Sequence, residues 1–190
     1  MISIKSGGST ETDSPGPAGE YGMSVLGRER IFEHISHKKG TEVFIYRLNY
    51  AINLRYGVLY DIASQIINDK PVQLTTPNFN CIWQGDANEI ALRALRYTET
   101  PPQIMNITGP ETVSVKYVAQ KMGKLLGKKP TFTGEKVPKA YLSNASQAIE
   151  NFGYPSVSLN TLIKWQIQWL QNDGTTLNKP THFQERKGKF

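Results

Sequence analysis

The sequence predicts a mixed α/β protein, because short β-rich apolar runs alternate with amphipathic helical segments along most of the chain. Its 190 residues are enough for one domain with a sizeable core. The predicted strands are residues 42–50, 72–74, 80–83 and 103–107. The main predicted helices are residues 20–39, 58–67, 115–126 and 159–170.

The first predicted helix, residues 20–39, follows a loop rich in proline and glycine. Apolar residues recur along it at helical spacing, namely Tyr21, Val25, Phe32 and Ile35. Two lysines followed by Gly40 form a typical helix stop. The strand over residues 42–50 is too apolar for an exposed strand, so we expect a central strand of a parallel sheet.

Two later helices have clear amphipathic patterns. In residues 58–67 the apolar side chains recur on one helical face. The helix over residues 115–126 has Ser114 as its expected N-cap and Gly127 as its expected end. Both helices are therefore predicted to pack one apolar face against a core.

Asp86 and Glu89 precede an apolar helical run with the spacing of a capping box, in which an acid at the N-cap is followed three residues later by Glu. The same two acids also fit a carboxylate pair or a metal site. Capping and the helix macrodipole explain both residues more simply, so we predict a structural role. Cys81 lies in an apolar strand and is expected to be a buried small hydrophobe.

Composition and charge exclude several classes of protein. A single cysteine allows neither an internal disulfide nor a cysteine-based metal cluster, and no metal site is predicted. No apolar run is long enough to span a bilayer and the polar start is no signal peptide, so we expect no membrane partner and a cytoplasmic location. The formal net charge is +6, but no nucleic-acid reading motif accompanies it, so we expect no nucleic-acid partner.

Three short motifs occur in a characteristic order. Residues 10–17 are Thr-Glu-Thr-Asp-Ser-Pro-Gly-Pro, residues 21–25 are Tyr-Gly-Met-Ser-Val, and residues 47–49 are Arg-Leu-Asn. This order resembles the second half of the extended short-chain dehydrogenase/reductase family, the NAD-dependent sugar epimerases and dehydratases. In that family a Thr-Glu-x-Asp-x-Pro-x-Pro loop leads into Tyr-Gly-x-Ser-Lys on a helix, and a strand with Arg-Leu-x-Asn follows. The resemblance covers nearly all of residues 9–172.

The resemblance implies that Tyr21 is the equivalent of the family's catalytic tyrosine, a general acid/base. Residues at i and i+4 share a helix face, and an ammonium there lowers the pKa of a phenol toward a usable range. Here the family's lysine is replaced by Val25. Arg28 lies about two turns from Tyr21, too far to replace the lysine directly. Spacing alone equally allows Tyr21 to be a half-buried helix aromatic.

The segment after the strand at 42–50 supplies two candidates for substrate contacts, Asn49 and Arg55. Open α/β sheets bind ligands in loops at the carboxyl ends of their strands. Arg55 fits equally well as a loop residue that satisfies the local backbone. The resemblance implies NAD or NADP as the parent cofactor, a nucleotide-sugar or similar small molecule as the ligand, and a homodimer in which the helix at 20–39 takes part.

The resemblance further implies an incomplete Rossmann-like fold, made of its late strands and helices, plus a small C-terminal α/β substrate-binding part. We expect residues 1–70 to be the end of a Rossmann-like NAD(P)-binding domain, residues 71–172 the smaller part and residues 173–190 a tail. Met1 would then begin in mid-domain. The sequence holds no Gly-x-x-Gly-x-x-Gly motif, so no residue is assigned to cofactor binding.

Two hypotheses of function follow. The leading one is the C-terminal portion of an NAD(P)-dependent nucleotide-sugar epimerase/dehydratase-like protein that is not catalytic alone. The replacement of the lysine by Val25 and the lack of the glycine motif both favour the absence of independent catalysis. The alternative is a non-catalytic ligand-binding or protein-interaction module related to that family.

Overall fold

The computed structural model describes residues 2–3, 7–135, 139–179 and 181–184. Its helices are α1 (Gly19–Lys39), α2 (Val58–Ile67), α3 (Gln84–Arg93), the 3-10 helix η2 (Ala94–Tyr97), α4 (Val115–Leu126), α5 (Ser146–Phe152) and α6 (Leu159–Gln171). Its strand pairs are β1 (Ile2–Ser3) with β10 (Lys139–Ala140), β2 (Phe44–Leu48) with β7 (Gln103–Ile107), β3 (Ala51–Ile52) with β6 (Ile82–Trp83), β4 (Val72–Gln73) with β9 (Phe132–Thr133), and β5 (Asn78–Phe79) with β8 (Val113–Ser114). The predicted α/β class is confirmed.

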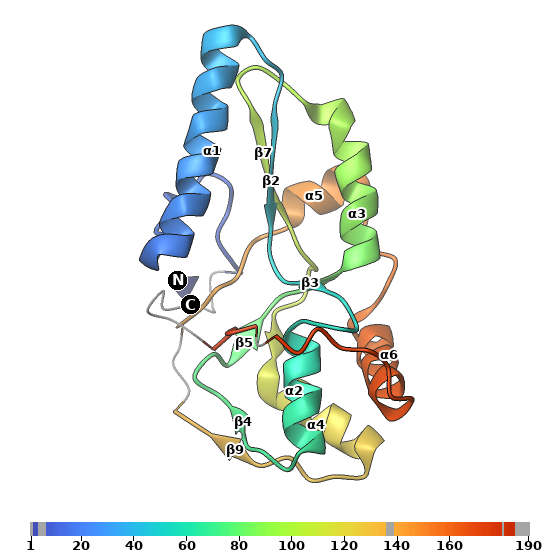
Figure 1. The fold of residues 1–190 in the computed structure, drawn as a ribbon. Coiled ribbons are helices and arrows are strands. Elements are labelled where there is room, and N and C mark those ends of the chain that lie inside the picture. Colours follow the sequence, from blue (N-terminus) through green and yellow to red (C-terminus); the bar gives the residue numbers. More distant parts are fainter. Residues whose placement is uncertain (1, 4–6, 136–138, 180, 185–190) are drawn as a thin grey trace.

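The longest strand pair, β2 with β7, is parallel and lies between two layers of helices. Figure 1 shows α1 on one side of this pair and α3 and α5 on the other. Successive side chains of a strand point to opposite faces, and the contacts of β2 follow that rule. The Tyr46 hydroxyl donates to the carbonyl of Ala87 in α3 over 2.8 Å, whereas the next residue, Arg47, binds Glu29 of α1. The arrangement is a three-layer α/β/α unit.

The sequence predicts a central strand over residues 42–50, and here the structure differs. Among the described residues, β2 has one strand neighbour, β7, and its other edge is unpaired. The apolar composition of β2 is explained by the helices that cover both of its faces rather than by strands on both of its edges.

The helix predicted at 20–39 is confirmed as α1, and it ends as expected, with Gly40 in the left-handed conformation at φ 67°. The apolar residues that recur along this helix are largely uncovered. Tyr21 is 65% exposed and Phe32 is 51% exposed, and Ser36 is the one buried residue of the helix. A helix of 21 residues therefore rests on the sheet through a narrow stripe and leaves large apolar side chains uncovered.

The main core lies at the other end of the molecule, where α2, α4 and α6 pack together (Figure 1). The amphipathic helices predicted at 58–67 and 115–126 coincide with α2 and α4. Ser114 caps α4, because its hydroxyl accepts from the amide of Tyr117 over 3.3 Å, and Gly127 ends the helix as predicted. A smaller core joins α3, α5 and β7. The proposed domain boundary near residue 70 stays a prediction.

Asp86 has a structural role, but it is not the predicted cap. α3 begins at Gln84, and the buried carboxylate of Asp86 accepts from the Ser156 hydroxyl over 2.6 Å and from the Val157 amide over 3.0 Å. Asp86 therefore ties the loop after α5 to the start of α3. Glu89 instead pairs with Arg93 on the exposed surface of the helix.

The first part of the predicted tail is anchored to the main core. Buried Phe183 belongs to that core, and Thr181 donates both its hydroxyl and its amide to Asp61 of α2. Burial raises the pKa of Asp61, and the bonds from Thr181 oppose that rise. Residues 185–190, which the sequence assigned to the same tail, lie outside the described residues.

Cys81 is buried in the main core, as predicted, and burial raises the pKa of its thiol to about 12. In the unfolded chain the thiol titrates near its usual value of 9.0. The unfolded state therefore loses this proton first, so the contribution of Cys81 to stability should fall as the pH rises through the window between these two values.

We expect the native thiol of Cys81 to resist alkylation at pH 8 and to react once urea unfolds the chain, measured by mass shift. Rapid alkylation of the native protein would contradict this.

Candidate functional site

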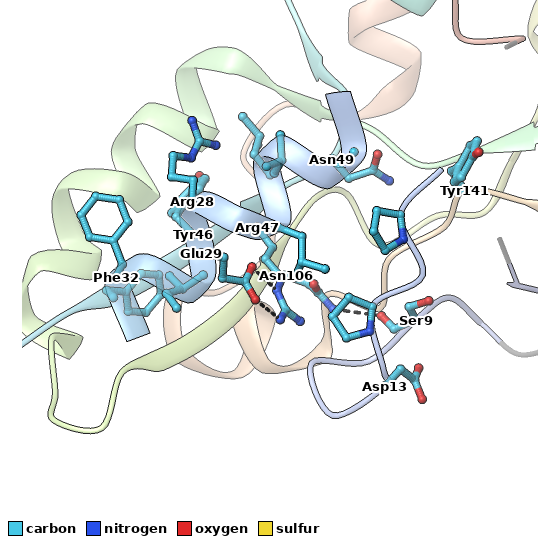
Figure 2. Close-up of a pocket in the computed structure, with 18 of the residues that line it drawn as sticks. Ser9, Asp13, Arg28, Glu29, Phe32, Tyr46, Arg47, Asn49, Asn106 and Tyr141 are labelled. Carbon is cyan, nitrogen blue, oxygen red and sulfur yellow. Dashed lines mark hydrogen bonds and ion pairs between the residues drawn. The ribbon is translucent and has the colours of Figure 1, made fainter. Parts of the chain in front are cut away.

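An open groove of about 1940 Å³ runs along α1 and β2, where the polar loop, the first helix and the strand meet. One wall is α1, the floor is the segment over residues 42–50, and the opposite wall comes from α3 and η2. The loop over residues 8–18 closes one end (Figure 2). The three motifs singled out from the sequence therefore meet around one space.

Tyr21 and Val25 line this groove from the first two turns of α1. Tyr21 is largely exposed, which fits the site-equivalent interpretation better than that of a half-buried helix aromatic. Val25 occupies the position one turn on, so no ammonium is presented there to the phenol. Arg28 also lines the groove, two turns beyond Tyr21. The catalytic role of Tyr21 stays a prediction.

An ion pair that sequence analysis missed joins the helix to the strand. The Arg47 guanidinium donates to both carboxylate oxygens of Glu29, with Nε–Oε2 at 3.0 Å and Nη2–Oε1 at 2.5 Å (Figure 2). The hydrogen bond and the charge of Glu29 raise the pKa of Arg47. A further guanidinium nitrogen donates to the carbonyl of Glu11 over 3.2 Å. Arg47 thus fixes α1 and the polar loop to β2 at once.

The polar loop is held by a second side chain of the sheet, Asn106 of β7. Its amide nitrogen donates to the Ser9 carbonyl over 2.9 Å, and its backbone N–H donates to the Glu11 carboxylate over 2.8 Å. Figure 2 shows the bond to Ser9 as a dashed line. The loop that leads into α1 is therefore fixed against two neighbouring strands.

Asn49, the first predicted substrate contact, lies just after β2 and lines the groove. Its amide donates to Oδ1 of buried Asn80 over 2.7 Å, and Asn80 in turn donates to the Ser143 carbonyl over 2.6 Å. Asn80 therefore orients Asn49 from behind. No local motif marks Asn80 as a partner of Asn49, because the two residues are separated by 31 positions.

Arg55, the second predicted substrate contact, does not line the groove. Its side chain and its backbone N–H both donate to Oδ1 of Asn53, over 3.3 and 3.0 Å. Its carbonyl accepts from the amide of Leu177. These bonds match the alternative that Arg55 satisfies local loop groups, and its contact with substrate stays a prediction.

The groove offers hydrogen-bonding side chains, a phenol and cations. Within the described ranges, no group of three or more His, Cys, Asp and Glu residues is arranged to hold a metal ion. Across the same residues, no helix combines the length and the apolar character needed to cross a bilayer. A phenol, an oriented carboxamide and a nearby arginine can bind polar hydroxyl and phosphate groups.

No protein-family model and no curated protein sequence matches this chain. Solved structures do match. The UDP-glucuronic acid 4-epimerase from Bacillus cereus in complex with NAD has 24% sequence identity and a TM-score of 0.73. It is matched over 87% of this chain and 56% of its own. The UDP-glucose 4-epimerase from Thermotoga maritima with UDP-glucose has 17% identity and a TM-score of 0.70, over 87% and 57% of the two chains.

A third similar structure is the UDP-glucose 4-epimerase from Thermus thermophilus in complex with NAD, with 19% identity and a TM-score of 0.68. It is matched over 86% of this chain and 58% of its own. The chain thus spans somewhat more than half the length of the structures that it matches. Over the matched part its fold is that of these epimerase structures, which confirms the predicted incomplete Rossmann-like fold.

Proposed function

We propose that this chain is the C-terminal portion of an NAD(P)-dependent nucleotide-sugar epimerase/dehydratase-like protein and that it is not catalytic alone. The observation that carries the proposal is that Tyr21, Val25 and Asn49 line one groove. The fold it shares with epimerases solved with NAD or a UDP-sugar supports the same proposal. The ligand would be a nucleotide-sugar or a similar small molecule.

In this proposal the residues of the chain act on the substrate side. Asn49, oriented by Asn80, would bind polar groups of the nucleotide-sugar, and the Tyr21 hydroxyl would face the sugar carbon that reacts. Arg55 would contribute a contact from the neighbouring loop. The cofactor, when bound, would accept and return hydride. Val25 cannot provide the ammonium that makes a phenol an effective acid/base, which is why we propose no independent catalysis.

A titration of the 190-residue chain with NAD⁺ and NADH, followed by calorimetry and by NADH fluorescence, tests this proposal. We expect no saturable binding at micromolar concentrations, because the sequence lacks a glycine-rich phosphate cradle. The Bacillus cereus epimerase, which was solved with NAD, is the positive control. Micromolar binding by the isolated chain would contradict the proposal.

The second candidate is a non-catalytic ligand-binding or interaction module, and the exposed apolar side chains of α1 favour it. Met23 and Ile31 are 55% and 64% exposed and lie outside the groove lining. This outward part of α1 is where the proposed homodimer would form. A cytoplasmic location belongs to the proposal as well and rests on the sequence alone.

A further inference from the structure

The three-layer part of the molecule stops at β2, but the helices on both of its faces extend past that strand. The groove beside β2 is lined by Phe32 and Ile35 of α1 on one side. Ala94 and Leu95 of η2 line it on the other side. A space that is lined by α1 on one side and by η2 on the other fits one more strand of the same sheet, held between two helical layers.

The floor of the groove is an edge of β2 that pairs with no other strand among the residues that the structure describes. The N–H groups of Val43 and Asn49 donate toward β7, to the carbonyls of Glu99 and Ile107. Because the direction of backbone groups alternates along a strand, the N–H and C=O groups of Phe44, Tyr46 and Leu48 point into the groove. These three residues present a template for another strand.

Nothing in β2 protects this edge from pairing. Natural proteins blunt exposed edges with proline, lysine, bulges or very short strands. β2 reads Phe-Ile-Tyr-Arg-Leu over five residues, pairs in continuous register with β7 and carries none of these features. Its one charge, on Arg47, is directed to Glu29 rather than across the edge.

The walls of the groove are apolar enough to bury a strand on both faces. Phe32 is 51% exposed, Ile35 is 40% exposed and Leu95 is 69% exposed. Strands that are covered by helices on both faces are parallel and nearly continuously apolar. A strand in this groove would need the same composition, and parallel pairing would continue the β2–β7 arrangement.

We propose that the groove binds a parallel, predominantly apolar β-strand of a second α/β unit, which continues the sheet through β2. The matched solved structures support this occupant, since the matched region makes up 56–58% of their chains and leaves the length of such a unit outside it. The inference rests on the proposed function and names the partner that it requires. A second copy of this chain would offer the same edge in an antiparallel arrangement instead.

The test supplies the second unit as a separate chain. The part of the Bacillus cereus epimerase outside the matched region is co-expressed with the 190-residue chain, and the corresponding parts of the Thermotoga maritima and Thermus thermophilus enzymes serve as further probes. We expect a one-to-one complex with at least one probe. In that complex the amides of Phe44, Tyr46 and Leu48 should exchange with solvent about tenfold more slowly or better, whereas those of Ile45 and Arg47 should change little.

Two variants of α1 give a matched control. Phe32→Asp places a charge in the groove wall and is expected to weaken the complex by about tenfold or more. Ile31→Asp makes the same change one residue away, at a side chain that is exposed but does not line the groove, and should leave the complex intact. Both sites are exposed in the isolated chain, so both variants should fold.

Several outcomes would overturn the proposal. They are the absence of a complex with all three probes, a complex that leaves the three edge amides unprotected, and equal effects of the two variants. Protection of the same amides in the chain alone, together with a dimeric mass, would assign the edge to a second copy. The readout needs no cofactor, so its result is independent of the NAD titration that tests the proposed function.

Discussion

Replacing Gly109 by alanine is expected to destabilise the protein more than any other single methyl addition that the fold suggests. A Cβ at residue 109 would lie 2.1 Å from the carbonyl oxygen of Cys81 and 3.2 Å from its carbonyl carbon. Both atoms belong to the backbone, so no side chain can rotate away. We expect a loss of about 3 kcal/mol or more in the free energy of unfolding, measured from urea midpoints, because the turn after β7 and the segment before β6 would have to separate.

Gly27→Ala is the matched control for this change. Nothing lies within 4 Å of the Cβ that it would add, and the residue is inside α1. Alanine is the better helix former, so this variant should gain roughly 0.5–1 kcal/mol. An unchanged urea midpoint for Gly109→Ala would show that the close approach of residue 109 to Cys81 is not part of the native structure.

Sequence patterns predicted the local structure well where one segment carries its own signal. The apolar periodicity of α2, the hydroxyl of Ser114 and the glycine at 127 each specify a helix or its end without help from distant residues. Asp86 shows the limit of such patterns. Its spacing to Glu89 fits a cap, but its actual partners, Ser156 and Val157, lie 70 and 71 positions away.

The sequence predicted some residues of the candidate site and missed others. Tyr21 and Asn49 were found because short motifs marked them, and both line the groove. Asn80 was missed because a lone asparagine in a strand has no distinguishing pattern. The exposure of Phe32 cannot be predicted from the sequence pattern, for another reason. Helical spacing shows that side chains share a face, but it does not show whether anything covers that face.

The second large effect concerns Arg47, whose pair with Glu29 is expected to hold α1 on the sheet. Both side chains are largely covered, with 22% and 11% of their surfaces exposed. Arg47→Ala would leave the Glu29 carboxylate without its bidentate partner and would remove the donor to the Glu11 carbonyl. We expect a loss of about 2–3 kcal/mol, since an unpaired and largely covered charge is costly. Arg47→Lys should restore only part of the lost free energy of unfolding, because a lysine ammonium cannot form the bidentate pair.

Arg30→Ala is the matched control, because it tests whether removing any arginine near α1 lowers stability as much as removing Arg47. Arg30 also pairs with a glutamate, Glu33. The two residues lie one turn apart on the same helix, and the Arg30 side chain is 55% exposed. Exposed ion pairs contribute little to stability, so this change should lower the free energy of unfolding by less than about 0.5 kcal/mol.

Limited trypsin digestion gives the local readout, because α1 buries Ser36 alone and has little else to keep it docked. With Arg47→Ala, cleavage within α1 should accelerate while α2 and α4 stay intact. Uniform acceleration over the whole chain would mean that Arg47 stabilises the fold globally and does not act as the attachment point of α1.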